Sequence, residues 1–367
     1  MTSDRMRICQ IALTLVEGIG DVLARNLVSH FGDAQSVFGA SLKALTAVPG
    51  ISRKRAEAIR NFSGWHLAES EWKFVTRHQI DLHFIQDSSY PGRLLHIADA
   101  PVILYSRGRM NLNAERFVAV VGTRRCTDEG RRFTEQLIRG LKPYGATVVS
   151  GLAYGIDGVA HQSAMQEGLP TIAVLAHGLN RIYPSRHAAV ARQMMCNGGL
   201  LTEFRHTDPF EAQNFPLRNR IIAGMCDATI VVETPREGGA LITARLAAGY
   251  SREVFCVPGR PCDPQAQGCN ALIRSQLATL IESADDVAEV MGWKQHESSP
   301  VRQAQLFDEL PAEEQQVLQA LRNSQPQHVD ALAANTRLSS SALAMALLQL
   351  ELKDLITALP GKQYRCR

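Results

Sequence analysis

Between residues 116 and 293, short apolar segments rich in β-branched residues alternate with segments of helical periodicity. Phe117–Val121 is apolar throughout, which is typical of a strand buried on both faces of a sheet. Arg131–Leu141 follows, with its large apolar residues on one helical face. Further strands are expected at Ala146–Val149, Thr171–Leu175, Leu200–Glu203, Ala228–Glu233 and Glu253–Val257. This alternation implies right-handed crossovers and a parallel sheet covered on both sides, so we predict an α/β, Rossmann-like doubly wound domain over 116–293.

The residues before this domain predict a helical N-terminal domain over 1–73 and a connecting segment over 74–115. Two short Gly-containing turns, Val16–Gly20 and Val48–Ser52, recur 32 residues apart between apolar helices. This arrangement resembles the helix-hairpin-helix (SAM-like) motif, whose turn amides can hold a DNA phosphate. A packing module without DNA contact remains the alternative.

The residues after it predict a polar linker over 294–308 and a winged-helix domain over 309–367, built from three helices and a hairpin. The expected recognition helix begins at Ser339 and carries no basic residue before Lys353. A helix that reads the major groove presents Arg, Lys, Asn or Gln. A structural or protein-contact role therefore fits this domain better than sequence recognition.

Composition sets few limits on function. The net charge is +3 and the pI is about 8.4, which permits nucleic-acid binding without arguing for it. No run of apolar residues reaches the roughly 18 that a membrane span needs. The eight cysteines form no C-x-x-C pair, so neither a zinc site nor a disulfide framework is predicted. Reduced cysteines in such a chain lead us to expect a cytoplasmic protein.

Ligands of a doubly wound sheet bind outside the carboxyl ends of its strands, and here those ends are rich in glycine and arginine. Glycine lets a ligand approach the backbone, and helix N-termini offer amides to an anion. The sequence therefore predicts a phosphate-binding edge whose basic residues are Arg124, Arg125, Arg181, Arg186, Arg218 and Arg220.

One stretch of this edge, Asn214–Arg220, combines an aromatic ring, two arginines and two amides. Proline disfavours helix in the residue before it, so Phe215 is expected on a loop, with the arginines at or near the first turn of the next helix. A ring beside guanidinium groups suits a nucleotide, because the ring stacks on a base and the guanidinium binds phosphate. A core Phe beside solvated arginines is the alternative for these residues alone.

Candidates for catalysis are weak. Asp157 is better placed to begin the helix that runs to His161 than to act in a reaction. Glu203 and Glu233 are a conceivable acid pair, although no partner stands at a motif spacing from either. The chain has neither a G-x-x-x-x-G-K-[ST] loop nor a G-x-G-x-x-G turn after its first strand. A nucleotide- or glycosidic-bond-processing enzyme with Glu203 or Glu233 as acid-base group is the rival function.

Taken in order, the strand ends resemble the DNA-processing protein A (DprA/Smf) family of natural transformation. The resemblance rests on Val121–Arg124, Ser150–Asp157 with Ala160 and His161, Tyr183–Pro184, Phe215–Gly224, Leu241–Ala244, Val257–Gly259, and Gly268 with Asn270–Ile273. It implies sequence-independent single-stranded DNA binding and loading of the RecA recombinase onto incoming strands. It also implies a homodimer without turnover chemistry, cofactor or metal.

By motif, the resemblance assigns DNA contact first to Arg124, Phe215, Arg218 and Arg220. It implies that Ser150, Gly151, Gly178 and Asn219 shape the pocket.

The chain departs from the family pattern at Thr123, Tyr154, His187 and Gly238–Ala240, where the family usually has Ser, Arg, Asn and Ser-Gly-Ser. The lost arginine and hydroxyls are expected to weaken phosphate contacts or shift them to Arg181, Arg186 and His187.

Overall fold

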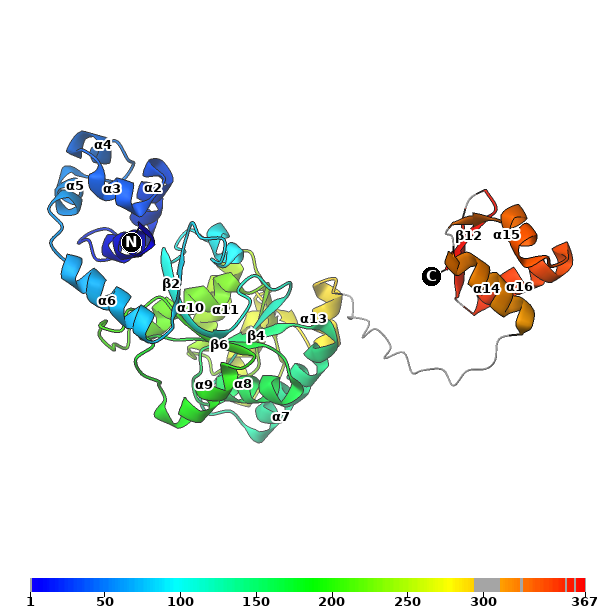
Figure 1. Ribbon diagram of the computed structural model, residues 1–367. Helices are drawn as coiled ribbons and strands as arrows, with labels where there is room; N and C mark the ends of the chain where they lie inside the picture. Colours follow the sequence, from blue (N-terminus) through cyan, green and yellow to red (C-terminus); the bar gives the residue numbers. More distant parts are fainter. Residues whose placement is uncertain (1, 294–310, 324–325, 354, 360, 367) are drawn as a thin grey trace. The chain divides into compact units, whose positions relative to one another are not determined.

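The structure, a computed structural model, describes residues 2–293, 311–323, 326–353, 355–359 and 361–366. The chain divides into two compact units, Met1–His296 and Glu297–Arg367 (Figure 1). The predicted linker over 294–308 lies outside the described residues.

The first unit is built on a nine-stranded sheet of the described residues, in the order β1-β2-β6-β5-β4-β3-β7-β8-β9. Every pairing from β6 to β9 is parallel, which confirms the predicted Rossmann-like sheet. Its parallel strands are β3 (Phe117–Val121), β4 (Thr147–Ser150), β5 (Thr171–Val174), β6 (Gly198–Thr202), β7 (Ala228–Val231), β8 (Glu253–Cys256) and β9 (Thr279–Leu280).

The segment 74–115, expected to be a connection, contributes two strands to this sheet. β2 (Ile103–Arg109) pairs antiparallel with β6, and β1 (Asp81–Phe84) pairs antiparallel with β2. Without them the outer edge of β6 would present unpaired backbone groups. The expectation was wrong here because the two apolar pieces were too short to show a strand period.

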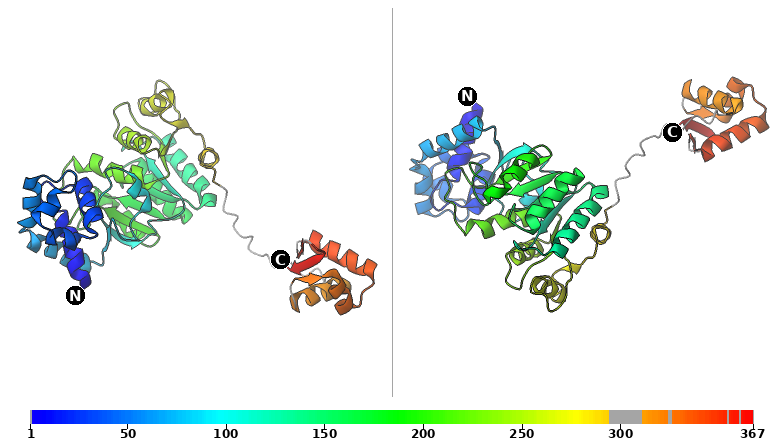
Figure 2. Two further views of the ribbon diagram at one scale, coloured as in Figure 1. Left: turned by 90° about the horizontal axis from the view of Figure 1, so that it is seen from above. Right: turned by 90° about the horizontal axis from the view of Figure 1, so that it is seen from below.

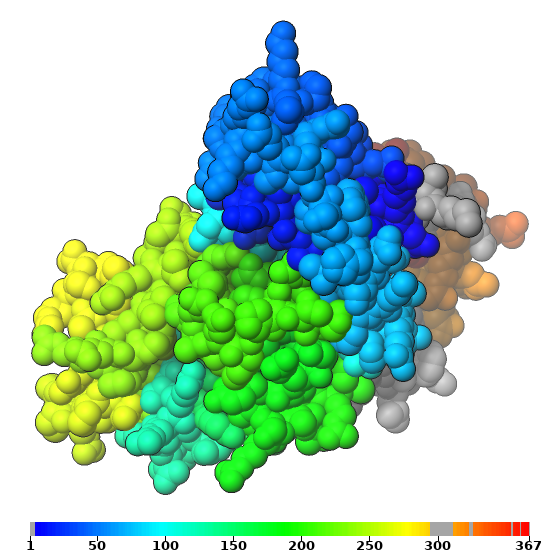
Figure 3. All heavy atoms as spheres, turned by 90° about the vertical axis from the view of Figure 1, so that its left-hand side faces the viewer, coloured from blue at the N-terminus to red at the C-terminus, as the bar shows by residue number. Residues whose placement is uncertain are grey.

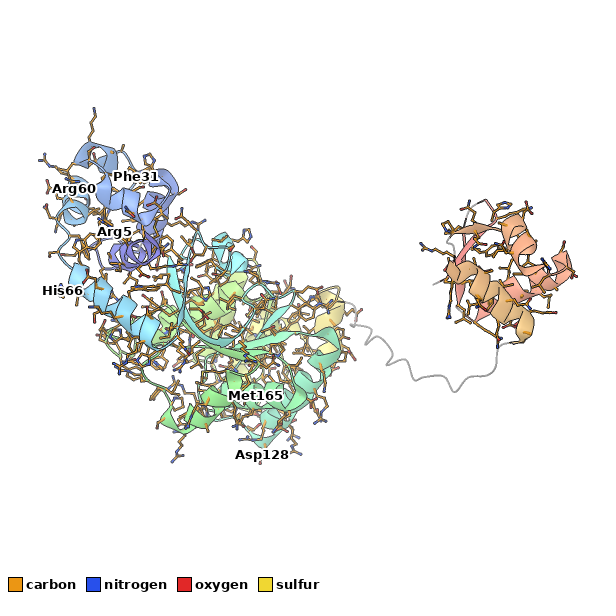
Figure 4. The ribbon with its side chains drawn as sticks, in the orientation of Figure 1. Arg5, Phe31, Arg60, His66, Asp128 and Met165 are labelled. Atoms are coloured by element: carbon orange, nitrogen blue, oxygen red, sulfur yellow. The ribbon has the colours of Figure 1, made fainter. Side chains whose placement is uncertain are left out.

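Helices cover both faces of the sheet because alternate residues of each buried strand point to opposite sides. Val118 and Val120 pack on the side of α7 (Asp128–Leu141) and α8 (Ile156–Glu167). Figure 4 labels Asp128 and Met165 on these two helices. The opposite residues of β3 face α10 and α11. The remaining elements here are η1 (Gly92–His96), η2 (Lys142–Tyr144), η3 (Ser185–His187), α9 (Ala188–Met194), α10 (Asn214–Met225), α11 (Ala240–Gly249), α12 (Gln267–Arg274) and α13 (Ala284–Val290).

The N-terminal helices form a small bundle (Figure 2). They are α1 (Thr2–Leu13), α2 (Asp21–Phe31), α3 (Ala34–Gly39), α4 (Leu42–Thr46), α5 (Arg53–Arg60) and α6 (Trp65–Arg77). The two predicted hairpin turns place Gly18 at φ 77° and Gly50 at φ 85°, a region that favours glycine. The helical prediction is confirmed, and α6 continues past residue 73.

The second unit has the predicted winged-helix architecture. Its three-stranded sheet of described residues runs β10-β12-β11, and Leu321, Leu343 and Leu350 lie in its core. Its elements are α14 (Ala312–Asn323), β10 (Gln327–His328), α15 (Val329–Thr336), α16 (Ser340–Leu352), β11 (Ile356–Leu359) and β12 (Gln363–Cys366). Within the described ranges, no helix combines the length and apolar character that a membrane span requires.

Candidate nucleic-acid interface

A pocket of about 380 Å³ opens at the carboxyl ends of β3, β4 and β7. Its walls come from residues 121–124 after β3, from the start of α10 and from the loop between β7 and α11. Figure 3 shows a face on which turquoise (around residue 130), green (around 200) and yellow-green (around 240) segments meet. The pocket therefore lies at the edge where a doubly wound sheet binds its ligands.

Four residues of α10 line this pocket: Phe215, Arg218, Asn219 and Ile222. Their spacing of three, four and seven residues places them on one helical face. Phe215 is in the first turn of α10, not on a loop, so this part of the prediction was wrong. Proline is tolerated in a first turn because its missing N–H would have no helical partner there.

Arg218 forms the buried floor of the pocket, with only 5% of its surface exposed. Its Nη1 donates hydrogen bonds to the carbonyl oxygen of Gly151, at 3.0 Å, and to that of Val174. Burial lowers the pKa of Arg218 to about 10, and the carboxylate of Asp157 acts in the opposite direction. The pocket thus has a fixed positive charge whose position is set by two strand ends.

Gly151 is required by this arrangement. A Cβ atom at residue 151 would lie 2.5 Å from a guanidinium nitrogen of Arg218. The predicted pocket-shaping role of Gly151 therefore has a physical reason, which is to leave room for Arg218.

Asp157, at the start of α8, holds the loop that leads into this helix. Its Oδ2 accepts hydrogen bonds from the backbone N–H groups of Gly151, at 3.1 Å, and Ala153, at 3.3 Å. Burial raises the pKa of Asp157, whereas Arg218 lowers it. These contacts support the expected structural role at the helix start.

Arg124 lies at the mouth of the pocket, and its side chain is exposed. Its guanidinium carbon is 5.6 Å from the centre of the Phe215 ring, which is within cation–π range. Among the described residues no carboxylate forms an ion pair with it. Arg124 and Phe215 thus present a charge and a ring to the same space.

Arg220 does not line the pocket, contrary to the prediction. Residues two apart on a helix point about 200° from each other, so Arg220 lies on the face of α10 opposite Arg218. Its Nη2 forms ion pairs with Asp21, at 3.1 Å, and with Glu203, and only 9% of its surface is exposed. Arg220 therefore joins α10 to the N-terminal helices.

The carboxyl group of Glu203 should make stability depend on pH. Burial raises its pKa from an ordinary 4.5 to about 7, although Arg220 acts against this shift. Because the folded pKa lies above the unfolded one, ionisation of Glu203 costs stability as the pH rises from about 4.5 to about 7. We expect the free energy of unfolding of Glu203→Gln to fall less than that of the unaltered protein across this window. Urea unfolding at several pH values checks this, and parallel pH profiles would contradict it.

The suggested acid pair of Glu203 and Glu233 is not formed. Each residue follows a different strand, and the order β6-β5-β4-β3-β7 separates them by four strand spacings, or ~19 Å. Glu233 instead accepts hydrogen bonds from the backbone N–H of Thr127, at 2.9 Å, and from the Thr127 hydroxyl.

Ser150 and Gly178 act at one remove from the pocket. The Ser150 hydroxyl is buried and donates to the carbonyl oxygen of Val120 at 2.6 Å. A Cβ atom at residue 178 would lie 2.4 Å from the carbonyl oxygen of Arg205. Both residues therefore fix the loops that frame the pocket. Arg181 and Arg186 are exposed on the loop that follows β5.

Two departures from the family pattern have visible partners. A Cβ atom at residue 238 would lie 2.0 Å from the Thr234 hydroxyl oxygen, so this pocket wall requires Gly238. The Tyr154 ring packs edge-on against His187, with centroids 5.2 Å apart, and the His187 Nδ1 lies 2.9 Å from the carbonyl oxygen of Leu152.

Sequence reasoning missed Tyr183 and Phe210 as part of this edge. Their ring centroids lie 5.1 Å apart, and each lies 5.8 Å from that of Phe215. Tyr183 belonged to a quoted motif, yet neither residue stood at a periodic spacing from Phe215. Their meeting depends on the order of β5 and β6 in the sheet.

Comparison with known proteins agrees with these observations. A family model described as DNA recombination-mediator protein A matches residues 81–292, which include β1 and β2. A DprA winged-helix model matches 302–362, and a SAM-like helix-hairpin-helix tandem model matches 11–62.

Whole-length relatives show the same relationship. Protein Smf of Synechocystis sp. is 32% identical over 97% of this chain and 98% of its own. The solved structure of DNA processing protein A from Streptococcus pneumoniae is 30% identical, with a TM-score of 0.67, and covers 79% of this chain and 99% of that one. That of Helicobacter pylori, described for its single-stranded DNA binding mode, is 27% identical, with a TM-score of 0.53, and covers 58% and 98%. The chain belongs to the DNA recombination-mediator protein A family, also called DprA/Smf.

Proposed function

We propose that this protein binds single-stranded DNA without sequence preference at the pocket formed by Arg124, Phe215 and Arg218. The observation that carries the proposal is the exposed arginine beside a partly exposed ring, above a buried guanidinium. Phosphate is attracted to the arginines, and every base has a face that stacks on an aromatic ring. The Helicobacter pylori relative, described for binding single-stranded DNA, supports the same ligand here.

The lack of sequence preference follows from the side chains that line the pocket. Asn219 is an amide that could read a base edge, but its Oδ1 already accepts a hydrogen bond from Nε of Arg218 at 3.1 Å. Sequence recognition uses sets of bidentate contacts to base edges. An arginine and a ring instead contact the phosphates and faces that all nucleotides share.

By its family, we further propose that the protein loads the RecA recombinase onto this DNA during natural transformation and works as a cytoplasmic homodimer without turnover chemistry. The family resemblance supports these roles, and the separation of Glu203 from Glu233 removes the acid pair on which the rival enzyme depended. RecA filament formation on strands coated with single-strand binding protein, with and without this protein, tests the loading role. Equal rates would contradict it.

Reversing the charge of Arg124 tests the pocket itself. We expect Arg124→Glu to weaken oligothymidine binding roughly 10-fold or more, since a charge-assisted contact contributes about 1.5–3 kcal/mol. The slope of log affinity against log salt should flatten by about 0.7, because one phosphate contact to a single strand is lost.

The matched control is Arg139→Glu, at the other end of α7, whose exposed ion pair with Glu167 contributes little. It should bind like the unaltered protein apart from a small general charge effect. A salt slope for Arg124→Glu equal to that of Arg139→Glu would rule out the phosphate contact.

A further inference from the structure

Tyr183, Phe210 and Phe215 form a cluster of three rings at the carboxyl edge of the sheet. They come from three separate segments: the loop after β5, the loop after β6 and the first turn of α10. The rings meet at angles of 56°, 70° and 78°, so no two of them are stacked face to face. Phe215 also lines the pocket, which makes the cluster continuous with it.

Two of these rings remain open to solvent. Tyr183 is 44% exposed and Phe210 is 40% exposed, whereas Phe84, Phe117 and Phe255 of the same unit are fully buried. Rings present only for packing would be covered as these three are. Neighbouring exposed aromatic residues on a protein surface mark a binding site.

Positive charge accompanies the rings. The Arg181 guanidinium carbon lies 5.9 Å from the centre of the Phe210 ring, as that of Arg124 lies 5.6 Å from the Phe215 ring. The buried His177 packs edge-on against Phe210 with centroids 5.8 Å apart, which helps to fix this ring. The ring-and-arginine pair of the pocket is thus repeated toward β5 and β6.

We propose that Tyr183 and Phe210, with Arg181, form a second base-stacking subsite, which takes the nucleotides adjoining the one held at Phe215. This inference rests on the proposed function, because its ligand is the same single-stranded DNA continued beyond the pocket. Exposed rings beside arginines suit a strand whose base faces are free and whose phosphates are charged. A duplex hides its base faces, so it gains nothing from these rings.

Binding of a long oligothymidine to the double variant Tyr183→Leu/Phe210→Leu measures the contribution of the subsite. One stacked base contributes a factor of about 5 to 150 in affinity, so we expect at least a 5-fold loss. The salt slope should be unchanged, because no phosphate contact is removed. Arg181→Gln should flatten the slope by about 0.7.

Two controls separate stacking from folding. The exchange Tyr183→Phe/Phe210→Tyr keeps both rings and should bind like the unaltered protein. Leu95→Ala removes an apolar side chain that is 39% exposed, on η1, and should also leave binding unchanged. The urea unfolding midpoint of the double leucine variant should match that of the unaltered protein.

Photocrosslinking locates the bases directly. Oligothymidine carrying a single 5-iodouracil, placed in turn at successive positions, is irradiated with the full-length protein, and the crosslinked residues are mapped by mass spectrometry. Crosslinks at Tyr183 or Phe210, from positions other than those that reach Phe215, support the subsite. Crosslinks confined to Phe215, together with unaltered binding by the double leucine variant, would overturn it and leave the pocket standing. If the unaltered protein binds no oligothymidine at all, the proposed function fails first.

Discussion

Replacing Arg218 with methionine is expected to lower the free energy of unfolding of the first unit by about 3–5 kcal/mol, as when one member of a buried ion pair is removed. The guanidinium holds the carbonyl oxygens of Gly151 and Val174, and it lies opposite the buried carboxylate of Asp157. Methionine fills much of the space but leaves Asp157 without its counter-charge and two carbonyl groups without a donor. DNA binding should fall as well, because the pocket loses its floor charge.

Urea unfolding followed by tryptophan fluorescence measures this loss, because Trp65, Trp72 and Trp293 all belong to the first unit. The double variant Arg218→Met/Asp157→Asn removes the uncompensated charge and should recover part of the stability, but not the DNA affinity. A stability loss below about 1 kcal/mol for Arg218→Met would show that Arg218 and Asp157 do not stabilise each other.

Replacing Phe215 with alanine should weaken oligothymidine binding by roughly 10- to 100-fold, since one base stacked on an aromatic ring contributes about 1–3 kcal/mol. The ring is partly exposed at the pocket, and Arg124 lies over it, so truncation removes the stacking surface and one side of the cation–π contact. The salt slope should stay as it is, because Arg124 and Arg218 remain.

Phe215→Tyr keeps the ring and Phe215→Leu keeps most of the volume without it. If the ring stacks on a base, the tyrosine variant binds like the unaltered protein and the leucine variant like the alanine variant. If Phe215 only shapes the pocket wall, leucine restores binding. That second result would contradict the stacking role, which the sequence left open.

The architecture was readable from the sequence because buried parallel strands are apolar throughout and therefore visible one at a time. Phe117–Val121 was predicted with its observed bounds, and α7 began only three residues earlier than expected. β1 and β2 were not predicted as strands, because antiparallel strands at the edge of a mixed sheet are short and take their identity from pairing with β6.

The candidate site was predictable as a set of strand ends but not as a geometry. Arg218 and Arg220 were treated alike because both are arginines in one motif. Their fates diverge because α10 begins at Asn214 and turns them to opposite faces, one to the pocket and one to Asp21 and Glu203. Tyr183 and Phe210 escaped notice because only the order of β5 and β6 brings their loops together.

The most direct test of the account is a comparison of the unaltered protein's affinity for oligothymidine and for a duplex of equal length, over a series of salt concentrations. A pocket that combines stacking rings with arginines predicts submicromolar binding of the single strand, weaker duplex binding, and a preference for the single strand that persists as salt rises. Equal affinities that decline together with salt, or tighter binding of the duplex, would contradict it, because the rings would then contribute nothing and charge alone would account for binding.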